Sequence, residues 1–304
     1  MSKETKQTVQ TTGHAWDGDL QEFNNPLPNW WLWSFYATVV FAIIYWVLFP
    51  TFPVGKNFTK GVMNDITYVT SDGTENTTHW NTRSLHMKEM QLAREMQQPY
   101  LEKIQAASYV EIGSDQDMRA FAYSTAKVLF ADNCAACHQT GGAGVIGLYP
   151  NLADDAWLWG GSHAQIEASI REGRVGMMPG FKARFTDAQM GDMAAYVLSL
   201  SQVKDINVAS ARRGQAMFDG AAACSSCHTQ AGSGDVKMGA ANLTDQVWTV
   251  ANVPGAATVE GKLAEVKQVI ASGINRHMPA WKERLSETEI KMLTFYVHEL
   301  GGGQ

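Results

Sequence analysis

The chain has 304 residues, of which 45% are hydrophobic, and its formal net charge at pH 7 is −6. This length accommodates two domains, or two small domains and an anchor. Nucleic-acid binding depends on a basic surface, and the mild negative charge excludes that class of protein. The same charge suits a basic docking partner.

A candidate membrane anchor lies near the N-terminus. Residues 1–29 are polar, and the twenty residues from Trp30 to Phe49 carry no charge. A helix of that length rises roughly 30 Å, which is the thickness of a bilayer core. Tryptophans near both ends fit the aromatic belts of a membrane interface. We therefore predict a transmembrane anchor over 30–50, rather than a buried core helix or a cleaved signal peptide.

A polar connector is predicted over residues 51–117. Within it, Leu85–Ile104 is rich in helix-forming residues and is interrupted at Pro99. The methionines of this stretch are expected to pack against other side chains rather than to bind a metal.

The four cysteines form two Cys-x-x-Cys pairs, and each pair is followed by a histidine. They are Cys134 and Cys137 before His138, and Cys224 and Cys227 before His228. The pairs alone would also fit a redox dithiol or half of a zinc site. The added histidine completes the haem c attachment signature, and the two copies use every cysteine of the chain. The sequence therefore predicts two covalently bound haem c groups. A zinc site built from both pairs would leave the two histidines unexplained.

The part of the chain that follows the connector is an internal repeat. The cysteine motifs recur at an offset of 90 residues, from His138 to His228, and Ile166–Leu200 aligns with Val266–Leu300 without gaps. Each copy ends in a helix with one apolar stripe. We predict a mainly α fold in which the anchor is followed by two tandem class I cytochrome c-like haem domains, at 118–203 and 207–301.

The repeat also indicates the second iron ligands. A Met-Pro pair follows each motif, at Met178 and at Met278. Most methionines only fill cores, but a thioether at the same place in both copies favours ligation, which stabilises ferrous iron and raises the potential. Met177 competes with Met178, and His277 offers a bis-histidine alternative. The predicted iron ligands are His138, Met178, His228 and Met278. A repeat unit should be self-sufficient, so we pair each histidine with the methionine of its own copy and leave ligation across the copies open.

A backbone carbonyl is expected behind each motif histidine, because such carbonyls usually accept the second ring N–H of a ligating imidazole. Pro150–Leu152 fits this role in the first copy, and Ala241–Leu243 fits it in the second.

Three further motifs carry a family resemblance. They are Gly13–Gly18 before the anchor, Asn24–Trp33 leading into it, and the Trp-rich Asp155–Gly161 in the first haem domain. With these motifs the chain resembles the dihaem CcoP/FixP subunit of cbb3-type cytochrome c oxidases. The resemblance covers the anchor and both haem domains and is weak over the connector.

The resemblance implies a role in electron transfer. Such a subunit takes electrons from a donor cytochrome c or cytochrome bc complex and passes them to a monohaem cytochrome c subunit. Oxygen is reduced in a separate subunit with haem b and copper, so this chain would belong to a proton-pumping oxidase without carrying catalytic residues.

Location follows from the haem chemistry. Bacteria attach haem c outside the cytoplasm, so the haem domains are expected in the periplasm, behind a single span of the inner membrane. Two alternatives stay open. One is a free-standing anchored dihaem carrier, and the other is a dihaem peroxidase, which needs an open distal position on one haem.

Overall fold

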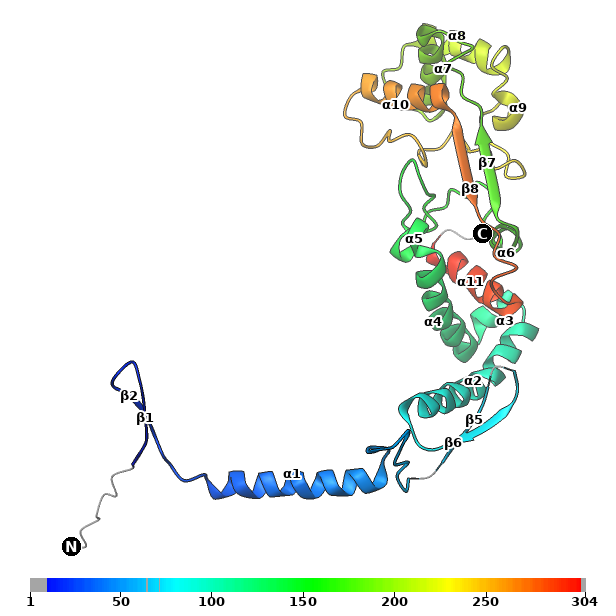
Figure 1. The fold of residues 1–304 in the computed structure, drawn as a ribbon. Coiled ribbons are helices and arrows are strands. Elements are labelled where there is room, and N and C mark those ends of the chain that lie inside the picture. Colours follow the sequence, from blue (N-terminus) through cyan, green and yellow to red (C-terminus); the bar gives the residue numbers. More distant parts are fainter. Residues whose placement is uncertain (1–9, 64, 71, 302–304) are drawn as a thin grey trace, which may run out of the picture. The chain divides into compact units, whose positions relative to one another are not determined.

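The computed structural model, drawn in Figure 1, describes residues 10–63, 65–70 and 72–301. The chain divides into two units, with the boundary between Gln97 and Gln98. The elements of the first unit are β1 (Thr11–Trp16), β2 (Leu20–Phe23), α1 (Asn29–Leu48), β3 (Pro53–Val54), β4 (Asn57–Phe58), β5 (Ile66–Val69), β6 (Glu75–Thr78) and most of α2 (Thr82–Ala106). The strands form three antiparallel hairpins, β1–β2, β3–β4 and β5–β6.

Helix α1 corresponds to the predicted anchor. It has 20 residues with a mean hydropathy of 1.8, none of them buried, so by length and composition it is able to cross a membrane. The last carbonyls of a helix lack partners within the helix. Here Val62 and Met63 donate their backbone N–H groups to the carbonyls of Val47 and Leu48, both at 3.1 Å.

Helix α2 differs from its prediction, because it continues through Pro99 instead of stopping there. Proline removes one backbone donor and normally kinks or ends a helix. Side-chain hydrogen bonds four residues apart lie near it, from Gln91 to Glu95 and from Gln98 to Glu102, and such pairs stabilise helices.

The second unit begins with the end of α2 and is mostly helical, as the sequence predicts. Its further elements are α3 (Tyr109–Ser114), α4 (Gln116–Asn133), α5 (Ala135–His138), η1 (Thr140–Gly142), α6 (His163–Glu172), β7 (Arg174–Met178), α7 (Asp187–Leu200), α8 (Val208–Asp219), α9 (Ser225–His228), α10 (Val259–Ser272), β8 (Ile274–Met278) and α11 (Glu287–Leu300).

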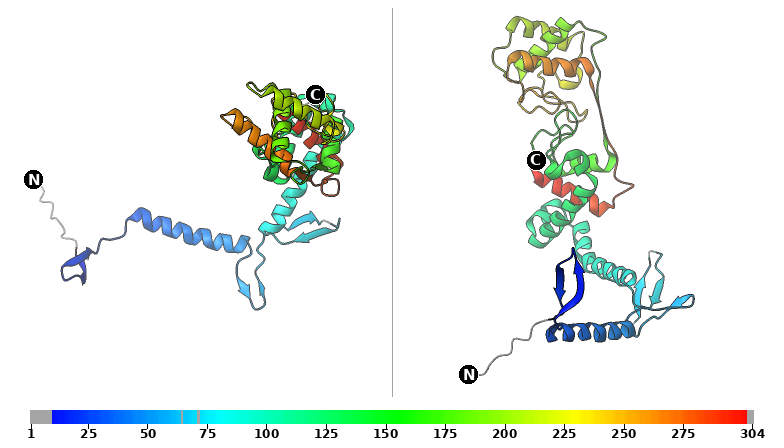
Figure 2. Two further views of the ribbon diagram at one scale, coloured as in Figure 1. Left: turned by 90° about the horizontal axis from the view of Figure 1, so that it is seen from above. Right: turned by 60° about the vertical axis from the view of Figure 1, so that its left-hand side comes forward.

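These elements form two lobes, and each lobe contains the last helix of the other repeat. The first lobe comprises α3–α6 and α11, and its core joins Phe130 and Ile170 to Leu293 and Phe295. The second lobe comprises α7–α10, with a separate core that includes Met193. The chain leaves the first lobe along β7 and returns to it along β8 (Figures 1 and 2). The expectation that each repeat packs on itself is therefore wrong, although the repeats are in tandem in the sequence.

Strands β7 and β8 form the antiparallel ribbon that joins the lobes. Gly176 pairs with Arg276 at its centre, and the pairing of Arg174 with Met278 is mirrored by that of Met178 with Ile274. Positions that are equivalent in the two repeats therefore pair reciprocally, around a local two-fold axis.

The same symmetry recurs beyond the ribbon. Phe181 donates its N–H to the carbonyl of Ile270 at 3.0 Å, and Trp281 donates to that of Ile170 at 3.1 Å. The unpaired carbonyls at the ends of α6 and α10 thus find donors in the other repeat.

Two glycines permit this crossing. Gly173 has φ 70° and ψ −177°, and Gly273 has φ 72° and ψ −173°, a region that is essentially restricted to glycine. A Cβ on Gly173 would lie 2.4 Å from the carbonyl oxygen of Met278, and one on Gly273 would lie 2.4 Å from that of Met178. Each glycine therefore lets the Met-Pro segment of the other repeat approach its helix end.

We predict that Gly273→Ala destabilises the second unit by more than about 1 kcal/mol, because it meets both a forbidden φ and a backbone oxygen. Gly191→Ala in α7 is the matched control, since its Cβ would meet nothing within 4 Å. The control should stabilise the helix by up to about 1 kcal/mol. Denaturant unfolding followed by circular dichroism measures both. Equal stability of the two variants would contradict the account of the crossing.

Candidate haem centres

The two motif histidines have the same geometry. His138 stands at the end of α5, and its Nδ1 atom lies 3.1 Å from the carbonyl oxygen of Pro150. His228 stands at the end of α9, and its Nδ1 atom lies 2.8 Å from the carbonyl oxygen of Ala241. A carbonyl only accepts, so each Nδ1 donates its proton and leaves the lone pair of Nε2 free for a metal. Burial also lowers the pKa of His138, against a smaller raising effect of this hydrogen bond, which favours the neutral imidazole. The predicted carbonyl partners are confirmed.

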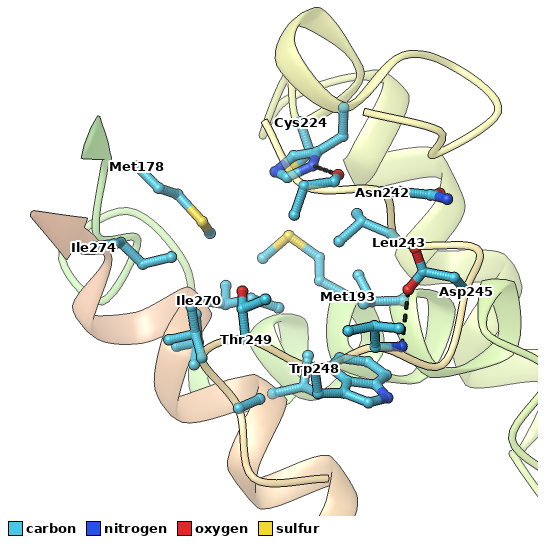
Figure 3. A pocket seen from close by; sticks show the side chains of 18 of the residues that line it. Met178, Met193, Cys224, Asn242, Leu243, Asp245, Trp248, Thr249, Ile270 and Ile274 are labelled. Atoms are coloured by element: carbon cyan, nitrogen blue, oxygen red, sulfur yellow. Dashed lines mark hydrogen bonds between the residues drawn. The ribbon is translucent and has the colours of Figure 1, made fainter. Parts of the chain in front are cut away.

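A cavity adjoins His228 in the second lobe. Its empty volume, including the part open to solvent, is about 810 Å³. The lining is mainly apolar and includes Met193, Val197, Phe218, Leu243, Trp248 and Ile270. Figure 3 shows Met178 entering from the side of the strands, with Cys224 across the cavity from it. Thiol, imidazole and thioether thus border one apolar space, and this donor set fits haem c.

The strand pattern distinguishes Met178 from its competitors. Side chains alternate between the two faces of a strand, and in β7 the inner face carries Met178 while Met177 is 80% exposed. In β8, His277 is likewise exposed and Met278 is half-buried. The inner face of the ribbon therefore presents the two Met-Pro methionines, and the outer face presents the alternatives.

Each Met-Pro methionine lies in the lobe that holds the motif histidine of the other repeat. Met178 lines the cavity of His228, and Met278 packs against the core of the first lobe, as Cys134 does. The expected pairs, His138 with Met178 and His228 with Met278, are not brought together. The reason is topological: the link from α6 to α7 is an extended strand, which carries Met178 out of its own lobe.

The environment of the cysteines does not suit the alternative chemistries. Burial raises the pKa of the Cys134 thiol to about 11 and also raises that of Cys224, whereas a reactive dithiol needs a lowered pKa. The two cysteine pairs belong to different lobes, so they do not build one zinc site. In the part of the chain that the structure describes, no three His, Cys, Asp or Glu side chains gather as a metal site.

Sequence reasoning assigned no role to several side chains between the lobes. The ring of Trp159, from the first repeat, packs directly on Gly239 of the second repeat. A Cβ added to Gly239 would lie only 2.3 Å from an atom of that ring. The guanidinium of Arg174 lies 5.0 Å from the centroid of the Trp159 ring. Arg276 donates to the carbonyl of Thr249 at 3.2 Å. Trp159 belongs to a motif that carried the family resemblance, whereas the arginines had no sequence signal beyond their place next to the Met-Pro pairs.

The fold and the sites define a class of protein. Two small helical lobes, each with a Cys-x-x-Cys-His motif and a carbonyl-bonded histidine, are those of a c-type cytochrome. The family model described as "Cytochrome C oxidase, cbb3-type, subunit III" matches residues 121–197 and 209–297. The model described as "N-terminal domain of cytochrome oxidase-cbb3, FixP" matches residues 8–56.

Similar proteins agree with these matches. The cbb3-type cytochrome c oxidase subunit FixP of Azorhizobium caulinodans is 40% identical, over 97% of this chain and 94% of its own length. The CcoP subunit of Azospirillum brasilense is 35% identical, over 99% and 98%, and FixP of Rhizobium etli is 36% identical, over 97% and 96%. The chain belongs to the FixP/CcoP family, the electron-transferring cytochrome c subunit of cbb3-type cytochrome c oxidase.

We predict that Met178→Leu removes a substantial part of the weak long-wavelength band by which oxidised cytochromes report an iron–methionine bond. Met177→Leu is the control, because its side chain lies on the outer face of the same strand, and it should leave the band unchanged. Absorption spectra of the two oxidised variants make the comparison. Loss of the band in Met177→Leu alone would show that the neighbouring methionine is the ligand.

Proposed function

We propose that this chain binds two haem c groups covalently and relays single electrons into a cbb3-type oxidase. The donor is a cytochrome c or a cytochrome bc complex, and the acceptor is a monohaem cytochrome c subunit that supplies the subunit with haem b and copper. The observation that carries the proposal is the duplication of the site. Each lobe contains a motif histidine whose Nε2 is free, together with a Met-Pro methionine that belongs to the other repeat.

The composition of the two lobes supports one ligand set for each haem. We assign one haem to Cys134, Cys137 and His138 with Met278 as the distal ligand. The other haem is assigned to Cys224, Cys227 and His228 with Met178. Haem supplies the one-electron chemistry, and a histidine–methionine pair raises its potential. The protein's own contributions are the fixed histidine tautomer and the apolar lining, which excludes water.

The relay role is supported by the distal positions. A peroxidase needs an open or displaceable position on one haem, but a methionine is available in each lobe. Oxygen reduction and proton translocation therefore belong to other subunits of the complex, and we assign no catalytic residue to this chain.

Anchoring completes the proposal. Helix α1 spans the bacterial inner membrane once, with the N-terminal segment in the cytoplasm and both lobes in the periplasm. The orientation rests on the site of haem c attachment, because the few lysines near α1 lie on both sides of it.

Two covalent haems can be counted directly. We expect the double variant Cys134→Ser, Cys137→Ser to retain one haem, and the variant lacking all four cysteines to retain none, because thioether bonds survive denaturation. Haem-stained denaturing gels, calibrated on the parent protein, provide the measurement. Full retention of haem in the double variant would refute the attachment at the first motif.

Assembly into the oxidase can be tested through the anchor. Four tryptophans (Trp30, Trp31, Trp33 and Trp46) lie in α1, more than a simple tether requires. We expect that replacing residues 29–48 by an unrelated single span leaves the haem content unchanged but abolishes co-purification with haem b and copper. The parent chain, which should co-purify with both, is the control. If the parent chain purifies without haem b and copper, the free-standing carrier is the better description.

A further inference from the structure

An arginine lies at the centre of the ribbon that joins the lobes. In β8 the half-buried side chains are Ile274, Arg276 and Met278, and the residues between them are exposed. Arg276 therefore shares the inner face with a proposed iron ligand and with a residue that lines the cavity of His228.

The guanidinium group of Arg276 uses only part of its hydrogen-bonding capacity within the protein. Within the described residues, its hydrogen bond runs from Nη2 to the carbonyl of Thr249 at 3.2 Å. No carboxylate in that part of the chain forms an ion pair with it, whereas Arg119, Arg171 and Arg213 all have acidic partners. Burying a cation without an anionic partner is costly. An anion supplied from outside the polypeptide would remove that cost.

The surroundings indicate where such an anion lies. Thr249, which accepts the bond from Arg276, lines the cavity of His228, as Ile274 does. Directly across the ribbon is Gly176, where an added Cβ would meet nothing within 4 Å. There is thus open space next to Arg276, because its partner on the neighbouring strand is a glycine without a side chain.

We propose that Arg276 binds the propionate carboxylates of the haem attached at Cys224 and Cys227, and that it raises the potential of this haem. The inference rests on the proposed function only in requiring that haem. Guanidinium groups match carboxylates in charge and in bidentate geometry. Oxidation of the iron adds a positive charge, and a nearby cation opposes it. The other arginine of the ribbon, Arg174, instead contacts Ser169 and Trp159.

The test is a redox titration of the full-length chain purified with its haems. We expect Arg276→Gln to shift the reduction equilibrium of one haem about tenfold toward the oxidised form, which is a fall of about 59 mV for one electron. The other haem should move less, and Arg276→Lys should retain most of the parent value. Arg212→Gln is the control, because it removes an exposed charge from the second lobe, and neither haem should respond.

A second readout separates propionate binding from a structural role. Redox-induced infrared difference spectra should show shifted propionate carboxylate bands in Arg276→Gln and, to a smaller extent, in Arg276→Lys. If both haems and the iron–methionine band persist while potentials and carboxylate bands stay unchanged, this proposal fails and the relay function stands. A loss of thermal stability alone would likewise overturn it. If the parent chain binds no haem at the second motif, the proposed function itself fails.

Discussion

The close backbone approach between each Met-Pro segment and the glycine at the end of the opposite helix is the constraint on which the second unit depends. At Gly173 and Gly273 a single Cβ would collide with the carbonyl oxygen of a proposed ligand methionine. The β7–β8 ribbon completes the crossing, but a two-stranded sheet alone is marginally stable in water. The ribbon therefore requires the lobes, and each lobe requires a helix from the other repeat. Neither repeat provides a complete core by itself.

This interdependence bears on electron transfer. Met178 and Met278 lie at opposite ends of one five-residue ribbon, four residues or about 13 Å apart along the strands. Both proposed distal ligands, and the cation of Arg276 between them, are thus held by one small element. A change in the ribbon would reach both sites, whereas two self-contained domains joined by a linker would respond separately.

The sequence predicted the chemistry of the sites better than their connectivity. The motif histidines, their carbonyl partners and the anchor helix could be read from local patterns, and the repeat distinguished Met178 from Met177. The same repeat could not show which copy each methionine faces. Equivalent helices have equivalent contact surfaces, so crossed and uncrossed arrangements satisfy the same apolar patterns, as in domain swapping. Arg276 was missed for a related reason, since its counterpart is Gly176 and a comparison of the copies hides a residue that only one of them has.

Crossed ligation is the central claim, and one spectroscopic comparison tests it most directly. In a chain with Cys224 and Cys227 replaced by serine, only the haem at His138 remains. Met278→Leu in that background should abolish the iron–methionine band, because Met278 is the distal ligand of the remaining haem, and Met178→Leu should leave the band in place. Loss of the band in Met178→Leu, with retention in Met278→Leu, would show that each repeat ligates its own iron and would contradict the crossed arrangement.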